Sequence, residues 1–94
     1  MLNPKELLSH YNLSDQESSI YLALLSLGKT GATQIAKKTG MNRTATYFHL
    51  NHLVEKKFVH QLRSGKIIKY VAASPKDLAE TFERWNTDFK SLIP

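Results

Sequence analysis

Basic side chains that could neutralise phosphate groups are concentrated in the middle of this chain of 94 residues. Between Lys29 and Lys76 there are ten lysines and arginines but only one acid, Glu55, which gives this stretch a net charge of +9. Acids outnumber bases in both flanking segments, so the overall charge of +5 understates the polarity of the chain. Because such a stretch can displace the counterions of a nucleic acid, we predict a nucleic acid as its partner.

Three histidines in the same stretch could support metal chemistry. His49 and His52 lie three residues apart and His60 follows, a spacing that could bind a transition metal if Glu55 completed the set. A metal-responsive protein is therefore one alternative, but we expect no metal site, because exposed histidines serve equally well as base or phosphate contacts. The chain has no cysteine, glycine-rich phosphate loop or nucleophile motif, so we expect neither a cofactor nor an enzyme.

The length of the chain predicts one small domain, which often gains stability by association with a second copy. No apolar run approaches the roughly 20 residues of a membrane span. The N-terminal residues Asn3 to Glu6 are not the apolar core of a secretory signal. We expect a cytoplasmic protein without a membrane partner, and no small-molecule ligand can be inferred.

Two helices are predicted before the basic stretch. Asn3 and Pro4 suit an N-cap and the first position of a short helix. Ser14 and Glu17 form a capping box at the start of a second helix, and Gly28 supplies its end. The wide apolar stripe of this second helix predicts a place at the centre of the core.

The next two helices have the spacing of a helix-turn-helix. A short helix over 32–39 ends at Gly40, and Asn42 is a good N-cap for a helix over 43–56. About three residues separate them, and the turn contains glycine, as is typical of this motif. The inward face of the second helix is predicted to hold Tyr47, Leu50, Leu53 and Val54. Its outward face is predicted to hold Ala45, Phe48 and His52, flanked by Thr44, His49 and Lys56.

A β-hairpin and a last helix complete the predicted layout. Segments 58–63 and 66–72 are rich in β-branched and aromatic residues on either side of Ser64 and Gly65, which predicts a wing over 59–72. Ser74 and Pro75 open the last helix. We therefore predict a mainly α fold with a small hairpin, in which residues 1–74 form a winged helix-turn-helix domain and 75–94 a C-terminal amphipathic helix.

The apolar residues of the last helix follow a heptad seam: Leu78, Phe82, Trp85, Phe89 and Leu92. One interpretation is a coiled-coil interface between two copies of the chain. The other is a helix folded back on its own core through Tyr11 and Ile20. We favour the homodimer, because an aromatic stripe on a terminal helix would otherwise stay exposed.

Motifs in a fixed order run from residue 13 to about residue 82. They are LSxxE at 13–17, IYLALLxLG at 20–28, IAxxTG at 35–40, RxxxY at 43–47, LxxLVEK at 50–56 and KYxA at 69–72, with Pro75 after the hairpin. This set resembles the winged helix-turn-helix domain of TrmB-type transcriptional regulators, within the MarR-like and ArsR-like superfamily. The resemblance implies a recognition helix in the DNA major groove and a hairpin on the neighbouring backbone.

The chain departs from that family pattern at four points. Lys57 stands where the family usually has glycine, so a left-handed helix end would cost about 1 kcal/mol or the helix ends differently. Asn42 stands where many relatives have proline, and Phe48 where many have a polar residue. Most relatives also continue into a large sugar-sensing domain, and we infer no sensing function here.

Charge, pattern and resemblance together predict a dimeric regulator that binds double-stranded DNA. The residues expected to contact DNA are Lys37, Lys38, Arg43, Thr44, Ala45, Phe48, His49, His52, Arg63, Ser64 and Lys66. An alternative function is a protein-binding or assembly module in which Phe48 anchors an apolar contact.

Overall fold

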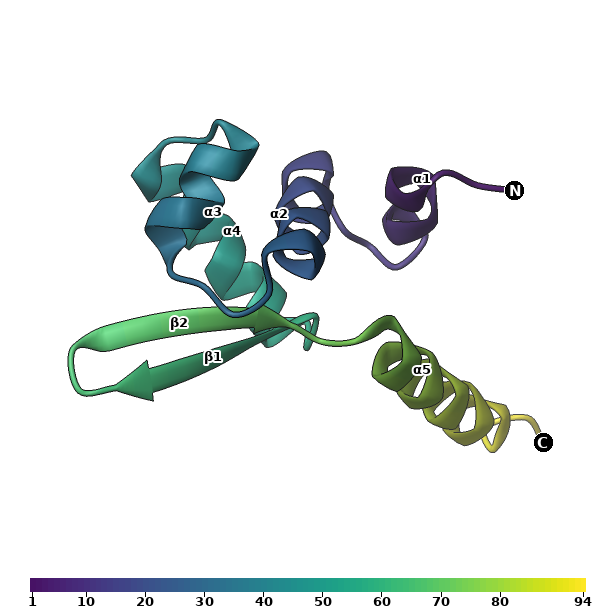
Figure 1. Ribbon diagram of the computed structural model, residues 1–94. Helices are drawn as coiled ribbons and strands as arrows, with labels where there is room; N and C mark the ends of the chain where they lie inside the picture. Colours follow the sequence, from purple (N-terminus) through teal and green to yellow (C-terminus); the bar gives the residue numbers. More distant parts are fainter.

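The computed structural model describes all 94 residues. Four helices precede a two-stranded antiparallel hairpin, and one helix follows it. Figure 1 shows helices α2 to α4 stacked above the hairpin, whose tip extends away from the rest of the molecule. The elements are α1 (Pro4–Ser9), α2 (Asp15–Leu27), α3 (Ala32–Thr39), α4 (Arg43–Glu55), β1 (Val59–Ser64), β2 (Ile67–Ala72) and α5 (Pro75–Lys90). The predicted fold class is confirmed.

The helix starts follow the capping residues that the sequence predicts. The Ser14 hydroxyl accepts a hydrogen bond from the Glu17 amide at 3.1 Å, and the Ser14 amide donates to Glu17 Oε1 at 2.8 Å. At the start of α4, Asn42 Oδ1 accepts from the Ala45 amide at 2.8 Å. Each cap satisfies a backbone donor that a helix leaves unpaired, which is why these helices start where they do.

The core lies where α2, α3 and α4 meet. Ile20, Leu24, Ile35, Leu50 and Leu53 are almost completely shielded from solvent. Burial of an aliphatic side chain of this size contributes about 1.5–3 kcal/mol, so these contacts between helices hold the domain together. The helix-turn-helix is therefore fixed to α2 rather than to the hairpin alone.

The inward face of α4 includes one buried residue that the prediction omits. Thr46 is fully buried, whereas Tyr47 and Val54 are only partly buried. The Thr46 hydroxyl donates to the Asn42 carbonyl oxygen at 2.8 Å, so this polar side chain enters the core with its hydrogen bond satisfied.

The hairpin turn lies one residue beyond the predicted position. Ser64 pairs with Ile67 and thus still belongs to the ladder, which leaves Gly65 and Lys66 as the two turn residues. Gly65 has a φ of +63°, as expected for a two-residue hairpin turn with glycine at its first position. Lys66 therefore sits at the tip itself.

A backbone bridge holds the base of the hairpin against the helices. The Tyr70 amide donates to the Thr30 carbonyl at 2.7 Å, and the Thr30 amide donates to the Tyr70 carbonyl at 3.0 Å. Nearby, the Tyr21 hydroxyl donates to the buried Ala73 carbonyl at 2.8 Å. These contacts fix the direction in which the wing leaves the core.

The end of α4 adopts the left-handed conformation despite the absence of glycine. Lys57 has a φ of +71°. Its amide donates to the Val54 carbonyl, and the next amide, of Phe58, donates to the Leu53 carbonyl. These two hydrogen bonds form a Schellman motif, which satisfies carbonyl groups at the end of the helix. Leu53 and Phe58 are both buried. The hydrogen bonds and the burial offset the conformational cost of a left-handed lysine.

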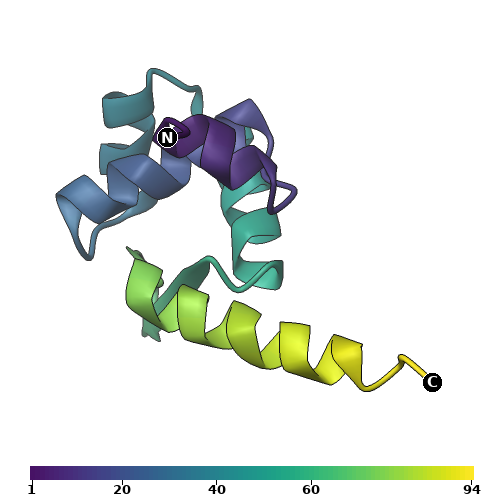
Figure 2. The ribbon, with the colours of Figure 1, turned by 90° about the vertical axis from the view of Figure 1, so that its right-hand side faces the viewer.

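Helix α5 combines a docked first half with an exposed second half. Leu78 is buried, and Phe82 stacks on Tyr11 with ring centroids 4.4 Å apart. Trp85 and Phe89 are exposed, and the helix extends away from the other elements (Figure 2). Leu92, the last member of the predicted seam, lies beyond the end of the helix at Lys90. No helix of this structure combines the length and the apolar character needed to cross a membrane.

Candidate nucleic-acid interface

The outward face of α4 carries a cluster of three aromatic rings, those of Phe48, His49 and His52. Phe48 is 56% exposed, and its ring lies 4.6 Å from the His52 ring and 5.2 Å from the His49 ring, measured between centroids. Thr44 and His52 are exposed, while Ala45 and His49 are partly buried. The face can therefore present one apolar surface and several hydrogen-bonding groups to a partner.

Arg43 occupies the first position of α4. Its side chain is exposed, and its guanidinium lies 5.9 Å from the centroid of the Tyr47 ring. Contact with an aromatic face at this distance is favourable for a cation. No acidic partner pairs with Arg43, so its hydrogen-bond donors stay free for a ligand.

Tyr47 of α4 and Tyr70 of β2 influence each other electrostatically. Burial raises the pKa of the Tyr70 phenol, the neighbouring Tyr47 adds to this rise, and Arg63 opposes it. Tyr70 on β2 therefore lies close enough to Tyr47 of α4 and to Arg63 of β1 to sense both electrostatically.

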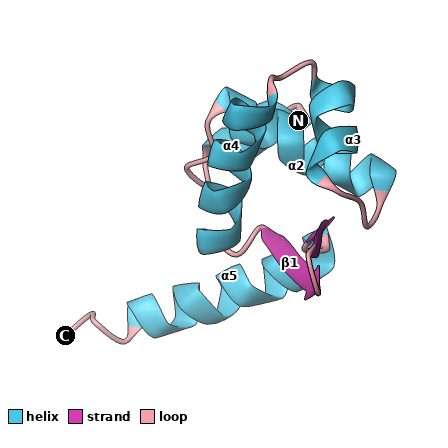
Figure 3. Cartoon of the chain, turned by 90° about the vertical axis from the view of Figure 1, so that its left-hand side faces the viewer, coloured by secondary structure: helices cyan, strands magenta, loops and turns pink.

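Further cations lie on α3 and on the wing. Lys37 and Lys38 are exposed in the last turn of α3, and Arg63, Ser64 and Lys66 are exposed at the tip of the hairpin. The hairpin contains no acid between Val59 and Ala72. Figure 3 shows α3 and α4 standing above the hairpin on the side of the molecule from which its tip projects. The three elements that carry the predicted residues thus lie next to one another.

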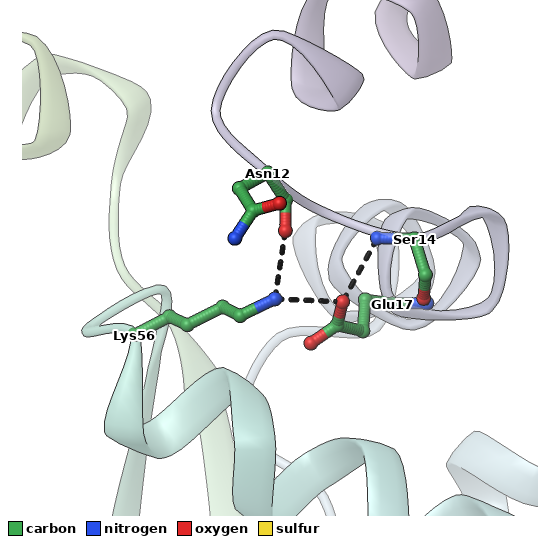
Figure 4. A network of polar contacts seen from close by, with 4 residues as sticks. All are labelled: Asn12, Ser14, Glu17 and Lys56. Atoms are coloured by element: carbon green, nitrogen blue, oxygen red, sulfur yellow. Dashed lines mark hydrogen bonds and ion pairs between the residues drawn. The ribbon is translucent and has the colours of Figure 1, made fainter.

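Lys56 is the basic residue that does not join this surface. Its ammonium donates to the Asn12 carbonyl at 2.7 Å and to Glu17 Oε1 at 2.9 Å (Figure 4). The prediction that Lys56 flanks the outward face of α4 is therefore wrong for its charged end, which turns toward α2. The sequence shows Glu17 as part of a capping box with Ser14, but no local signal reveals a partner 39 residues away.

The same network determines the ionisation of Glu17. Burial favours the protonated carboxyl, but hydrogen bonds from Ser14 and the ammonium of Lys56 outweigh it, so the pKa of Glu17 is lowered from its ordinary value of 4.5. Glu17 is 4% exposed and stays ionised at neutral pH. The pair connects the start of α2 with the end of α4.

The histidines do not form a metal site in this structure. His49 and His52 lie against Phe48 on α4, whereas His60 lies on β1. No group of three or more histidine or carboxylate side chains comes close enough together to hold a metal ion.

A second surface lies on the opposite side of α2 from the cations. An apolar groove of about 770 Å³ runs between α1, α2 and the first half of α5. Its walls include Leu7, Tyr11, Leu25, Leu78 and Phe82. Leu7, Tyr11 and Leu25 are exposed in the single chain, so the groove offers apolar area to a further partner.

Helices α2, α3 and α4, of which the last two form a helix-turn-helix, are followed by a hairpin, and this order of elements defines a winged helix-turn-helix protein. The family model described as "Sugar-specific transcriptional regulator TrmB" matches residues 8–76. The chain belongs to this family of transcriptional regulators and carries their DNA-binding winged helix.

Relatives in sequence and structure agree with this assignment. The chain is 32% identical, over 90% of its length, to the HTH-type sugar sensing transcriptional regulator TrmBL1 of Pyrococcus furiosus, of which it spans 27%. The structure of TrmBL2, an archaeal chromatin protein, aligns with this chain at a TM-score of 0.79 and 27% sequence identity. The alignment covers 96% of this chain and 35% of TrmBL2. A MarR family regulator from Silicibacter pomeroyi shares the fold, with a TM-score of 0.67 at 20% identity over 95% of this chain and 63% of that one. The chain therefore spans only about a quarter to a third of the TrmB relatives it matches.

Proposed function

We propose that this chain is a sequence-specific regulator of transcription that binds double-stranded DNA as a homodimer. The observation that carries the proposal is that α3, α4 and the wing lie next to one another (Figure 3) and that each carries exposed cations without an ion-pair partner. The protein acts by occupying an operator, not by catalysing a reaction, and it does so in the cytoplasm.

In this proposal α4 lies in the major groove and selects the sequence. Arg43 reaches a guanine edge or a phosphate, and Thr44 and His52 offer hydrogen bonds to bases. Phe48 contacts a thymine methyl, with Ala45 and His49 completing the face. The support is the exposure of this face and the free guanidinium of Arg43.

The remaining cations supply affinity through the DNA backbone. Lys37 and Lys38 pair with phosphates from α3, and Arg63, Lys66 and Lys69 do so from the wing, where the neutral Ser64 hydroxyl adds a hydrogen bond. None of these side chains takes part in an ion pair within the protein. Their charge is therefore available to a polyanion.

Salt dependence tests the DNA proposal. Five unpaired cations outside α4, namely Lys37, Lys38, Arg63, Lys66 and Lys69, should each release counterions. Fluorescence anisotropy of a labelled random-sequence duplex should then give a log-log salt slope of about −4 to −5 per protomer. An absence of binding at low salt would refute the proposal. Sequence preference is tested separately, by selecting bound duplexes from a random pool, and an unenriched pool would reduce the function to non-specific DNA binding.

The homodimer is proposed to form through α5, the segment beyond the winged helix of residues 1–74. Its exposed Trp85 and Phe89 continue the line of Leu78 and Phe82, which are docked in the same chain. A second copy related by a twofold axis can cover the exposed Trp85, Phe89 and Leu92. It can also cover the open apolar groove beside them. Twofold symmetry then requires a pseudo-palindromic operator with half-sites about one helical turn apart.

Sedimentation equilibrium tests the dimer. We expect a mass twice the 10.7 kDa of one chain for the unmodified protein. Trp85→Glu should give the single mass, because a charge would be buried in an apolar contact. Thr87→Glu, on an exposed position of the same helix, is the matched control and should stay dimeric. A single mass for the unmodified protein would argue against this interface.

The exposed Phe48 favours one other function, an assembly module that binds a protein. A contact anchored on Phe48 should respond only weakly to salt, in contrast to the steep slope expected for DNA.

A further inference from the structure

The wing has an apolar face that none of the contacts described above explains. Residues alternate across a strand, and the cross-strand pairs Gln61 with Tyr70 and Arg63 with Ile68 lie on the face toward the core. Leu62, Ser64, Ile67 and Lys69 therefore lie on the opposite, outer face. Ile67 is 61% exposed directly after the turn, and Leu62, also exposed, is its diagonal neighbour across the ladder.

This pair is unusual for a surface hairpin. Single apolar residues on a surface need no explanation, but two neighbours on the face of an isolated hairpin would normally be avoided, because such strands invite aggregation. Here they sit beside Lys66 at the turn and Lys69 on the same face, with no acid anywhere in the hairpin. The surface around Ile67 is therefore apolar at its centre, and the charged side chains beside it are all cationic.

The charge decides which partner fits. A protein partner would need an acidic rim around an apolar pocket, whereas DNA offers phosphates on both sides of a groove and, where a base step is opened, flat apolar base faces between them. Side chains such as isoleucine act as wedges between base pairs in proteins that bend DNA from the minor groove. With α4 in the major groove, the wing would meet the next groove along the duplex, which is the minor groove.

We propose that Ile67 is a wedge that enters the minor groove and partly unstacks one base step, so that the wing bends the DNA. Lys66 at the turn and Lys69 on the same strand pair with the phosphates on either side, and Leu62 covers the sugar edge beside the wedge. The inference rests on the proposed DNA binding and adds to it a second mode of sequence preference. Easily kinked steps such as TA should be favoured under the wing.

Energy transfer between dyes on the two ends of a duplex of about 30 base pairs with central TA steps tests the wedge. At saturating protein the unmodified chain should bend this duplex by about 20–90° and raise the transfer efficiency. Ile67→Ser should still bind but lose most of this rise. Ile93→Ser, at a position 70% exposed and distant in sequence from the wing, is the matched control and should bend the duplex like the unmodified protein.

The outcomes separate this inference from the proposed function. Saturable binding without a rise in transfer, or equal bending by Ile67→Ser, would overturn the wedge and leave DNA binding intact. In the second case the apolar face of the wing would be assigned to a protein contact. Failure to bind the duplex at low salt would overturn the proposed function, and the wedge with it.

Discussion

Replacing Arg43 with alanine should weaken DNA binding about 5- to 150-fold, which corresponds to about 1–3 kcal/mol. The guanidinium is exposed at the first position of α4 and has no acidic partner within the protein. Its contact with the Tyr47 ring holds the donors near one position before DNA arrives. Truncation therefore removes both charge and a preorganised set of donors.

The loss should come from the interface and not from unfolding. A cation at the N-terminus of a helix is slightly unfavourable, because the helix dipole is positive there, so Arg43→Ala should leave the stability of α4 unchanged or raised. Arg84→Ala is the matched control, since Arg84 is exposed on α5 and its side chain donates a hydrogen bond only to Thr81 of its own helix. Fluorescence anisotropy should show near-normal affinity for that control.

Arg43→Lys distinguishes the two roles that the position allows. A phosphate contact should keep most of its affinity with lysine, whereas a two-bond contact to guanine should lose sequence preference as well. Unchanged affinity of Arg43→Ala would remove this residue from the interface. In that case the face around Phe48 would be the stronger candidate for a protein contact.

Replacing Lys56 with methionine should lower the free energy of unfolding by about 2 kcal/mol at pH 7. The change leaves the Glu17 carboxylate buried without its countercharge, while Glu17 Oε2 already lacks a hydrogen-bond partner. Loss of one member of a fully buried pair costs about 3–5 kcal/mol. We expect less here, because the Lys56 side chain is 29% exposed and water can reach it.

The cost should depend on pH with a definite sign. In the folded protein the pKa of Glu17 lies below its ordinary value of 4.5, so the carboxylate contributes stability above that pH. This contribution is lost as the pH falls through the lowered pKa. The gap between Lys56→Met and the unmodified protein should therefore be widest at pH 7 and should narrow as the pH falls through the lowered pKa of Glu17, because this carboxyl is then neutral in both proteins.

Urea denaturation followed by circular dichroism, at pH 7 and again near pH 3, measures this gap at a fixed protein concentration. Lys57→Met is the matched control, because Lys57 is the next residue, is exposed and forms no ion pair. It removes the same charge and should change stability by less than about 0.5 kcal/mol. Equal stability of the two variants, or a gap that stays constant with pH, would contradict the role assigned to the Glu17 pair.

The candidate interface could be predicted in part from the sequence. The helical period places Phe48 and His52 outward, and the structure shows both exposed. The concentration of charge between Lys29 and Lys76 is visible in the sequence alone. The position of the cations relative to one another depends on the bridge between Thr30 and Tyr70, which orients the wing and which no local pattern reveals.

The sequence by itself determined the features that depend on neighbours within a few residues. Helix starts at Asn3, Ser14, Asn42 and Ser74 follow from capping bonds that span three residues, and the order of the elements follows from their periods. The heptad spacing of the last helix also predicts the apolar stripe to which the exposed Trp85 and Phe89 belong.

The tertiary structure alone decided the features that join distant segments. Lys56 turns from the predicted outward face to a carboxylate 39 residues away, and Leu78 and Phe82 leave the seam to pack on their own core. Lys57 adopts a left-handed conformation because the buried Leu53 and Phe58 fix the path of the chain on either side. The physical reason is the same in each case: burial and charge pairing over long separations outweigh local preferences of about 1 kcal/mol, and the sequence pattern records only the local preferences.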